Sequence, residues 1–390
     1  MKKIIAAVAA LQLAGAAFAY EKMPPELDAM VMRGITGIHQ LDFDGAEKVF
    51  GEILEKYPGQ PYGYFGLAMS QWGRLEYQQE ESSPTLNDSY EKKTDEAIDK
   101  GEAWLKKHPE DASAHVCVGG MYGLRSRLAL MKHSWIRAYF TGRKGLKHMK
   151  TAIKLDPEYY DAYLGPGMYE YYAGTLPSVI RILAKLFVSG DPEKGLTYLN
   201  LVKDKGHYTA TAAKLLLIEI YTQTGSKYAN PALALEWAKE LRKESPEHPM
   251  LHFVEIVCLY ENGKWEEVRA EAEEYLRRID KGVPNYGSIY TSRALIALGT
   301  SYLAENKLPQ AMEAFVRAEP PSKEKPNRWA VWSVVRAGNI RDLQGERKLA
   351  IADYKRALGY EDHWGFRDYI TAYIRKPYTA AQNPGQLPPP

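Results

Sequence analysis

The sequence predicts an all-α protein made of repeated helix pairs, and three observations support this fold class. Small and aromatic residues recur at fixed separations: Leu298–Gly299, Tyr302, Ala311, Phe315 and Ala318 follow one another at steps of 3, 9, 4 and 3 residues. Lysine- or glutamate-rich segments that end in proline, such as WLKKHPED, close one helix and precede the next. No stretch alternates apolar and polar residues as a half-buried strand does.

The repeated pattern resembles the tetratricopeptide repeat (TPR), a unit of two helices with a period of about 34 residues. The same offsets occur at Gly34, Ala46, Phe50 and Ile53, and again at Gly338, Ala350, Tyr354 and Ala357. We count about eight helix pairs in one domain over 20–376. The resemblance implies a right-handed superhelical solenoid in which stacked pairs share one core, with a concave surface that binds a peptide or a protein.

Three consecutive pairs, the second to the fourth, are longer than the others. Regular pairs have 12 residues between the small residues of their two helices, as from Gly299 to Ala311. The longer separations are 29 from Ala68 to Ala97, 26 from Gly119 to Gly145 and 28 from Gly167 to Gly195. We expect inserted helices within 70–94, 125–142 and 173–190, side by side on one face of the solenoid.

The third insertion predicts an amphipathic helix over 176–188. Its apolar face is formed by Leu176, Val179, Ile180, Leu183 and Phe187. Arg181 and Lys185 take the opposite face. Three interpretations remain open: a helix packed against its neighbours, a helix that lies on a membrane surface, or a lid over a groove. In the second and third of these, Leu176, Ile180, Leu183 and Phe187 form the contacting face.

The second insertion lies in a strongly basic window. Between Asp111 and Asp156 the chain has nine lysines and arginines and no acidic residue. We also expect Leu128, Met131, Trp135 and Tyr139 to lie along one face of an inserted helix. Because the chain is balanced in charge overall, this window indicates either a solvated basic face or a site for an anion or an acidic partner.

Six tyrosines follow the basic window, and we expect Tyr160 and Tyr163 to be packed but Tyr171 and Tyr172 to be displayed. The coincidence of insertions, charge and aromatic residues predicts one partner-binding site. Its candidate residues are Arg125, Arg127, Trp135, Arg137, Arg143, Lys144, Lys147, Tyr169, Tyr171 and Tyr172.

A narrower resemblance covers residues 110–225. The segment DPEYYDAYLGPGMYEYYAGTLPSVIRILAKLFVSGDPEKGLTYL is similar to the hallmark region of a TPR subfamily, with its G-x-Y-x-Y-Y stretch, LP-initiated helix and G-D-x-x-x-G-L motif. That subfamily contains exported bacterial proteins without assigned chemistry. It also contains a eukaryotic group linked to lipid droplets and inclusion bodies. The resemblance implies a scaffold or lipid-associated role and no catalytic residues.

The two ends of the chain differ from the rest. Residues 1–19 have the basic start, apolar core and Ala17-Phe18-Ala19 cleavage site of a signal peptide, so we expect an exported protein that starts near Tyr20 and is periplasmic, with an extracellular location as the alternative. The Pro/Gly-rich residues 377–390 predict a disordered tail. Cys117 and Cys258 lie in apolar helical stretches, which predicts two buried thiols.

Several function classes find no support in the sequence. Removing residues 1–19 takes away two lysines, so 51 basic residues become 49 against 49 acidic ones, and we expect no nucleic-acid partner. Enzyme and cofactor motifs are absent, and His248 and His252 have no third partner for a metal. We therefore expect a non-catalytic scaffold for protein partners. The alternative is a solenoid that binds lipid through residues 176–188.

Overall fold

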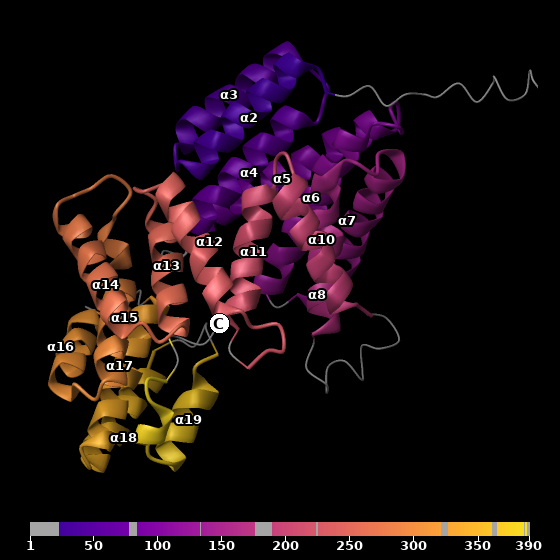
Figure 1. Cartoon of the computed structure of the whole chain (residues 1–390). Helices are drawn as coiled ribbons and strands as arrows, with labels where there is room; N and C mark the ends of the chain where they lie inside the picture. The colour runs from indigo at the N-terminus through magenta and orange to yellow at the C-terminus, as the bar shows by residue number, and fades with distance from the viewer. Residues whose placement is uncertain are drawn as a thin grey trace, which may run out of the picture. The chain divides into compact units, whose positions relative to one another are not determined.

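The computed structural model describes residues 23–77, 84–132, 134–175, 189–223, 225–320, 327–360, 365–385 and 387. In this part of the chain every regular element is a helix, and successive helices run antiparallel (Figure 1). The predicted all-α solenoid of TPR-like helix pairs is confirmed. The chain divides into two compact units, which consist of residues 1–73 with 85–213, and of 214–390 with 74–84.

In its described residues, the first unit contains four helix pairs, apart from residues 74–77, which belong to the second unit. They are α2 (Pro25–His39) with α3 (Phe43–Lys56), α4 (Tyr62–Tyr77) with α5 (Pro84–Leu105), α6 (Ala112–Met131) with α7 (Trp135–Leu155), and α8 (Leu164–Gly174) with α10 (Pro192–Lys205). A short 3-10 helix, Tyr160–Tyr163, precedes α8. Asp42, Asp111 and Asp191 accept hydrogen bonds from the first turns of α3, α6 and α10, so these helices start at the capping residues typical of helix N-termini.

The second unit continues the series. Its pairs are α11 (Ala210–Thr222) with α12 (Pro231–Glu244), α13 (Pro249–Glu261) with α14 (Trp265–Asp280), α15 (Thr291–Ala304) with α16 (Leu308–Ala318), and α17 (Arg328–Leu343) with α18 (Arg347–Leu358). A last helix, α19 (Arg367–Arg375), and a 3-10 turn, Ala380–Gln382, follow. The eight pairs agree with the number that the repeats predict.

Small residues hold the two helices of a pair close together, as the spacing predicts. A Cβ atom built on Gly299 would lie 2.5 Å from the Phe315 ring, and one on Gly338 would lie 2.6 Å from the Tyr354 ring. In the third pair, a Cβ on Gly145 would lie 2.8 Å from the carbonyl oxygen of Gly119. Since real Cβ atoms do not approach backbone this closely, a larger residue would push the helices apart.

The described extra residues of the second and third pairs are helical, and they lengthen the paired helices. Helix α6 ends at Met131 and α7 starts at Trp135. The expected single apolar face over 128–139 is therefore wrong, because its residues belong to two antiparallel helices. The turn allows the hydroxyl of Ser126 to donate to the carbonyl of Ala138 (2.7 Å) and α6 to pack along α7. The third insertion, 176–188, lies outside the described residues.

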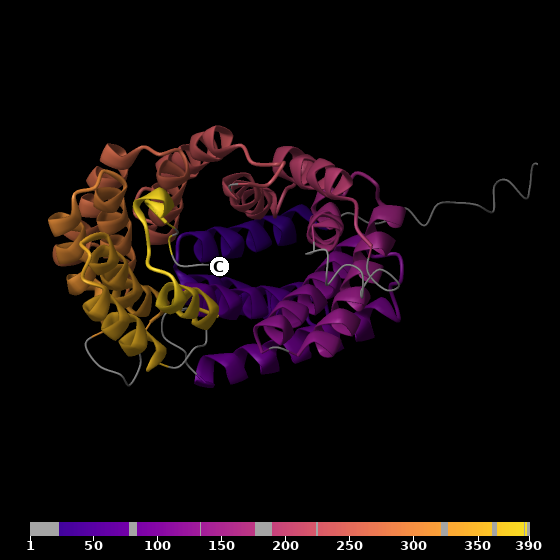
Figure 2. The same cartoon turned by 90° about the horizontal axis from the view of Figure 1, so that it is seen from below.

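The C-terminal segment corrects the prediction of a disordered tail from residue 377. Tyr378 is 2% exposed, and Thr379 and Gln382 form a reciprocal capping box around the last 3-10 turn. Leu387 packs against both core clusters of the second unit. Figures 1 and 2 show this segment, in yellow, turning back along the helices of that unit. Composition predicts disorder here, but two anchoring side chains supply long-range contacts that a composition argument does not include.

Candidate partner-binding surface

Helix α7 buries one face and displays another. Ala138, Gly145, Met149 and Ala152 are buried against the rest of the unit. Near its first turns, three large apolar side chains are mostly exposed to solvent: Trp135 by 65%, Ile136 by 77% and Phe140 by 62%. Isolated exposed apolar residues are ordinary, but three within six positions of one helix form a patch of the kind that binds partners.

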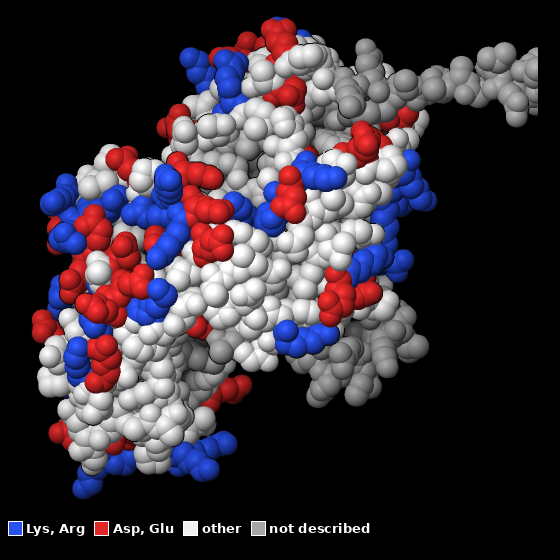
Figure 3. Space-filling view, viewed as in Figure 1, with Lys and Arg blue, Asp and Glu red and all other residues white. Residues whose placement is uncertain are grey.

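Basic residues continue the same face toward the C-terminal end of α7. Arg143, Lys147, Lys150 and Lys154 follow Phe140 at steps of 3, 4, 3 and 4 residues, the spacing that keeps side chains on one side of a helix. All four are exposed. Blue side chains accordingly follow the edge of the molecule along α7, whereas both signs are mixed over α14 (Figure 3). The displayed face of α7 therefore has an apolar start and a cationic continuation.

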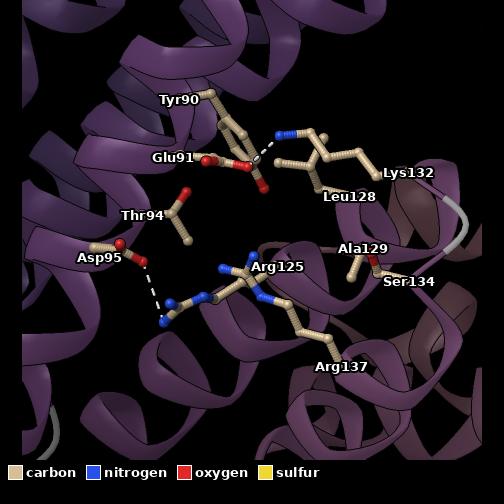
Figure 4. A pocket seen from close by; sticks show the side chains of 10 residues that line it. All are labelled: Tyr90, Glu91, Thr94, Asp95, Arg125, Leu128, Ala129, Lys132, Ser134 and Arg137. Atoms are coloured by element: carbon tan, nitrogen blue, oxygen red, sulfur yellow. Dashed lines mark hydrogen bonds and ion pairs between the residues drawn. The ribbon is translucent and has the colours of Figure 1, made fainter.

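A pocket lies beside the start of α7, between α5 and α6 (Figure 4). Two of the basic residues around it are neutralised by acidic residues of α5. A nitrogen of Arg125 lies 3.1 Å from Oδ1 of Asp95, and Lys132 is paired with Glu91. Because Arg125 has its own carboxylate, it contributes less free charge to a partner site than the sequence predicts.

The remaining cation of the pocket is Arg137, which extends from the first turn of α7. No hydrogen bond or ion pair joins Arg137 to another residue in the described part of the chain. Ser134 is the N-cap of α7, its hydroxyl makes no capping bond, and the first turn contains no acidic residue. Free N–H groups at a helix start attract anions. Together with Arg137, they make this pocket suitable for a carboxylate or another anion.

Thr94 adds a polar group to the wall of the pocket. Its side chain is 1% exposed, and its hydroxyl makes no hydrogen bond to any described residue. A buried hydroxyl without a partner is unfavourable, so a bound polar group that reaches Thr94 would be stabilised.

Other predicted cations contact aromatic rings. The guanidinium of Arg127 lies 4.8 Å from the centre of the Trp72 ring, and Nζ of Lys144 lies 5.3 Å from that of Tyr122. Arg143 donates to the hydroxyl of Tyr139 (3.1 Å). These contacts leave the charges exposed but hold the side chains in place. Lys147 is exposed, and its positive charge is one of the causes that lower the pKa of His148.

The predicted tyrosines do not join this surface. Tyr171 is 1% exposed, so the expectation that it is displayed is wrong. It lies one turn after Gly167 on α8, and both face α10, where Gly195 meets the backbone of Tyr171. Tyr169 and Tyr172 are half-buried on α8. The candidates Leu176, Ile180, Leu183 and Phe187 lie outside the described residues.

Ile136 and Phe140 are the site residues that the sequence analysis missed. They lie four positions apart, and Phe140 is followed by Arg143 and Lys147 at helical spacing. This pattern is visible in the sequence once a helix is started at Trp135. A single helix continued through 128–139 places Trp135 with Leu128 and hides the displayed face.

One histidine cluster with hydrogen-bonded partners is buried in the second unit, and another is partly buried in the first. His252 lies between the hydroxyl of Tyr286 (3.0 Å) and a carboxylate oxygen of Glu271 (2.9 Å), and burial lowers its pKa. His115 and His148 are joined by their Nδ1 atoms (3.0 Å), and burial lowers the pKa of His148 to about 4. Since His252 and Tyr286 are buried in the core of the second unit, their arrangement stabilises the fold.

Within the described residues, no group of three or more histidine, cysteine, aspartate or glutamate side chains is placed to hold a metal ion. Cys117 and Cys258 are free and buried, as predicted, and burial raises the pKa of both thiols. No described helix is both long enough and apolar enough to cross a membrane.

Comparisons with known proteins give distant structural likenesses only. No family model matches the chain, and no curated protein does so. A tetratricopeptide repeat protein from Parabacteroides merdae is 15% identical over 76% of this chain and 93% of its own, with a TM-score of 0.32. The human IFIT1 dimer with m7Gppp-AAAA is 14% identical over 92% and 87%, with a TM-score of 0.47. Yeast Tom70 is 10% identical over 88% of each chain, with a TM-score of 0.40.

Proposed function

We propose that this protein is an exported, non-catalytic scaffold that binds a protein partner through the start of α7. The observation that carries the proposal is the position of Trp135, Ile136 and Phe140, which are exposed directly beside the anion-receptive pocket of Arg137 and Ser134. Protein interfaces usually combine apolar side chains that become buried on binding with nearby charged groups that orient the partner.

The matching partner segment combines apolar and acidic side chains. Its apolar residues would cover Ile136 and Phe140, while a carboxylate would enter the pocket at Arg137. An acidic amphipathic helix has this combination, with further acidic residues facing the cations of α7. Burial of the two apolar side chains would supply most of the affinity, and the charges would orient the segment.

The neighbouring helix α5 favours a protein over a uniformly anionic membrane. Asp95 and Glu91 of α5 already pair with Arg125 and Lys132 at the pocket, so an anionic membrane laid on the start of α7 would gain little from these two cations. A protein partner can instead place a single carboxylate at Arg137.

Site-specific photocross-linking in the cell envelope tests this proposal. A photoreactive residue at position 136 should yield one specific cross-linked protein, and the yield should fall when Arg137 is changed to Glu. The same residue at position 349 is the matched control, since Leu349 is an exposed apolar residue of α18 (48%). If both positions capture the same proteins, or neither captures any, the α7 surface is not a partner site.

Liposome flotation separates the lipid alternative. Residues 20–390 should remain at the bottom of the gradient with vesicles of phosphatidylglycerol at low salt. Flotation that is abolished by Phe140→Asp would assign the α7 surface to a membrane instead of a protein. Flotation that depends only on Phe187 would support the predicted helix over 176–188.

Export is supported by the basic start, apolar core and Ala17-Phe18-Ala19 site of residues 1–19. The protein purified from its native cell should be recovered from the periplasmic fraction and should begin at Tyr20 by N-terminal sequencing. An unprocessed chain in the cytosol would contradict this part of the proposal.

A further inference from the structure

The two long helices of the third pair, α6 and α7, each place a histidine at the contact between them. The Nδ1 atoms of His115, on α6, and His148, on α7, lie 3.0 Å apart, and the centres of the two rings lie 5.2 Å apart. The two nitrogens therefore point at one another. A ring nitrogen without a proton carries a lone pair, and two lone pairs come this close only when a proton or a metal ion lies between them.

The second nitrogen of His115 determines where its lone pair points. Nε2 of His115 lies 3.1 Å from the carbonyl oxygen of Pro109. Because a carbonyl only accepts, Nε2 donates, and Nδ1 of the neutral ring carries the lone pair. Histidines that bind metal ions have this arrangement, in which one nitrogen binds the ion and the other donates to a backbone carbonyl or a carboxylate. His115 is thus oriented as a metal ligand whose lone pair faces His148.

The distance between the two nitrogens fits a shared ion. Imidazole nitrogens lie about 2.0–2.1 Å from a bound ion, so two of them are about 2.8–3.0 Å apart at a right angle and about 3.3–3.4 Å apart at a tetrahedral angle. The observed 3.0 Å matches neighbouring ligands in the square-planar sites that Cu²⁺ and Ni²⁺ prefer. One ring must turn so that both lone pairs meet at the ion. His148 is the less buried of the two and has room to do so.

One acidic group and two basic groups surround the pair. The Tyr122 ring stacks on that of His148, with 5.9 Å between the ring centres, and its hydroxyl donates to Glu102 of α5. Glu102 favours a positive charge at His148, whereas Lys147 and Lys144 disfavour one. Both lysines are exposed, so water and salt screen their charges more than that of the half-buried Glu102.

We propose that His115 and His148 form a binding site for a divalent transition-metal ion, with Cu²⁺ bound most tightly. Imidazole is a ligand of Cu²⁺, Ni²⁺ and Zn²⁺, and Cu²⁺ forms the strongest complexes of the three. The chain supplies two ligands, fewer than the three or four of permanent metal sites, so water completes the coordination and the ion exchanges readily. Because the site joins α6 to α7, a bound ion also fastens the helix that carries the exposed apolar patch.

The test uses residues 20–390 with Cu²⁺ alone as the probe. Titration calorimetry should detect binding, and Cu²⁺ should raise the thermal unfolding temperature, since an ion bound only by the folded chain stabilises it. His148→Asn should weaken Cu²⁺ binding at least tenfold and abolish the rise in unfolding temperature. His207→Asn is the matched control, because His207 is an exposed histidine of the same unit that pairs with Asp28 (3.1 Å) instead of a second histidine. It should bind Cu²⁺ as the wild type does.

Pulsed electron paramagnetic resonance of bound Cu²⁺ identifies the ligands without any substitution. We expect two imidazole ligands in the wild type, so this spectrum decides the case if circular dichroism shows that His148→Asn does not fold. One imidazole or none would contradict the proposal.

The proposal is also wrong if Cu²⁺ does not bind, because the two nitrogens would then share only a proton. Equal binding by His148→Asn and the wild type would place the ion elsewhere. Tyr122→Phe separates coordination from packing, since it removes the hydrogen bond to Glu102 but neither nitrogen. It should change Cu²⁺ affinity less than threefold, and a loss as large as that of His148→Asn would overturn the assignment.

Discussion

The start of α7 and the middle of α17 depart in opposite directions from the usual burial of apolar residues and exposure of charged ones. On α7, Ile136 and Phe140 are exposed although they are apolar, while on α17 Arg336 is buried although it is charged. The first surface lacks the cover that its side chains favour. The second surface is covered by the C-terminal segment, and Arg336 donates a hydrogen bond to a backbone carbonyl of that segment. One solenoid thus carries an open surface and an occupied one, each marked by residues unsuited to their surroundings.

The largest effect is expected where the two long helices α6 and α7 meet. Gly145→Val places a side chain against the carbonyl of Gly119 and should lower the free energy of unfolding by about 3 kcal/mol. Gly123→Val is the control on α6, since an added Cβ at Gly123 has no neighbour within 4 Å. Urea unfolding followed by circular dichroism measures both. Equal losses would mean that the close approach does not position the α7 surface.

Tyr378→Ala should destabilise the second unit by about 3 kcal/mol, because a buried aromatic side chain and the hydrogen bond from its hydroxyl to the carbonyl of Gln382 are lost. Binding at α7 should not change, since the exposed surface lies in the other unit. Thermal unfolding and partner capture measured on the same preparation check both statements. A loss of capture at temperatures where the variant is folded would show that the two surfaces are coupled.

Protonation of the His115–His148 pair should destabilise the first unit at low pH. The pKa of His148 is about 4 in the folded chain, below the ordinary value of 6.5. As pH falls below 6.5, the unfolded chain takes up the proton first, so stability is full above pH 6.5 and declines toward pH 4, by about 1–2 kcal/mol after allowance for partial exposure. Urea titrations at pH 7.5 and 5 measure the loss, and His148→Asn should reduce it. A pH-independent midpoint would contradict the burial of His148.

Ser134→Asp should change stability and binding in opposite directions. An aspartate at the N-cap of α7 would accept a hydrogen bond from the first turn and stabilise the fold by about 0.5–1 kcal/mol. The same carboxylate would occupy the anion-receptive pocket beside Arg137 and weaken partner binding. A stabilised chain with unchanged affinity would exclude the pocket from the interface.

The fold was predictable because its signal is local. The spacing of three residues within one short segment, Gly299, Ala311 and Phe315, predicts which side chains come into contact when two helices pair. The turn between α6 and α7 was not predictable in the same way. It falls at 132–134, where no glycine or proline marks a helix end, so the apolar pattern was continued across it.

The candidate site was predicted in part, for similar reasons. The charge of 112–155 is a property of composition, and it points to the part of the chain that contains the candidate surface of α7. Which cations are paired depends on α5, whose acidic residues lie about 40 positions earlier, as Lys132 and Glu91 show. The burial of Tyr171 could be predicted from the sequence, since Tyr171 shares a helix face with Gly167. The order of the C-terminal segment depends on contacts with α13 and α17, which no local pattern contains.

The most direct test of the central claim is the affinity of the cross-linked partner for the mature chain and two matched double variants. Ile136→Asp with Phe140→Asp places two charges on the α7 patch. Val316→Asp with Leu349→Asp does the same to exposed apolar residues of α16 and α18, which are 53% and 48% exposed. We predict binding at least tenfold weaker for the first pair and unchanged for the second. If both pairs bind as the wild type does, the exposed start of α7 is not the partner-binding surface.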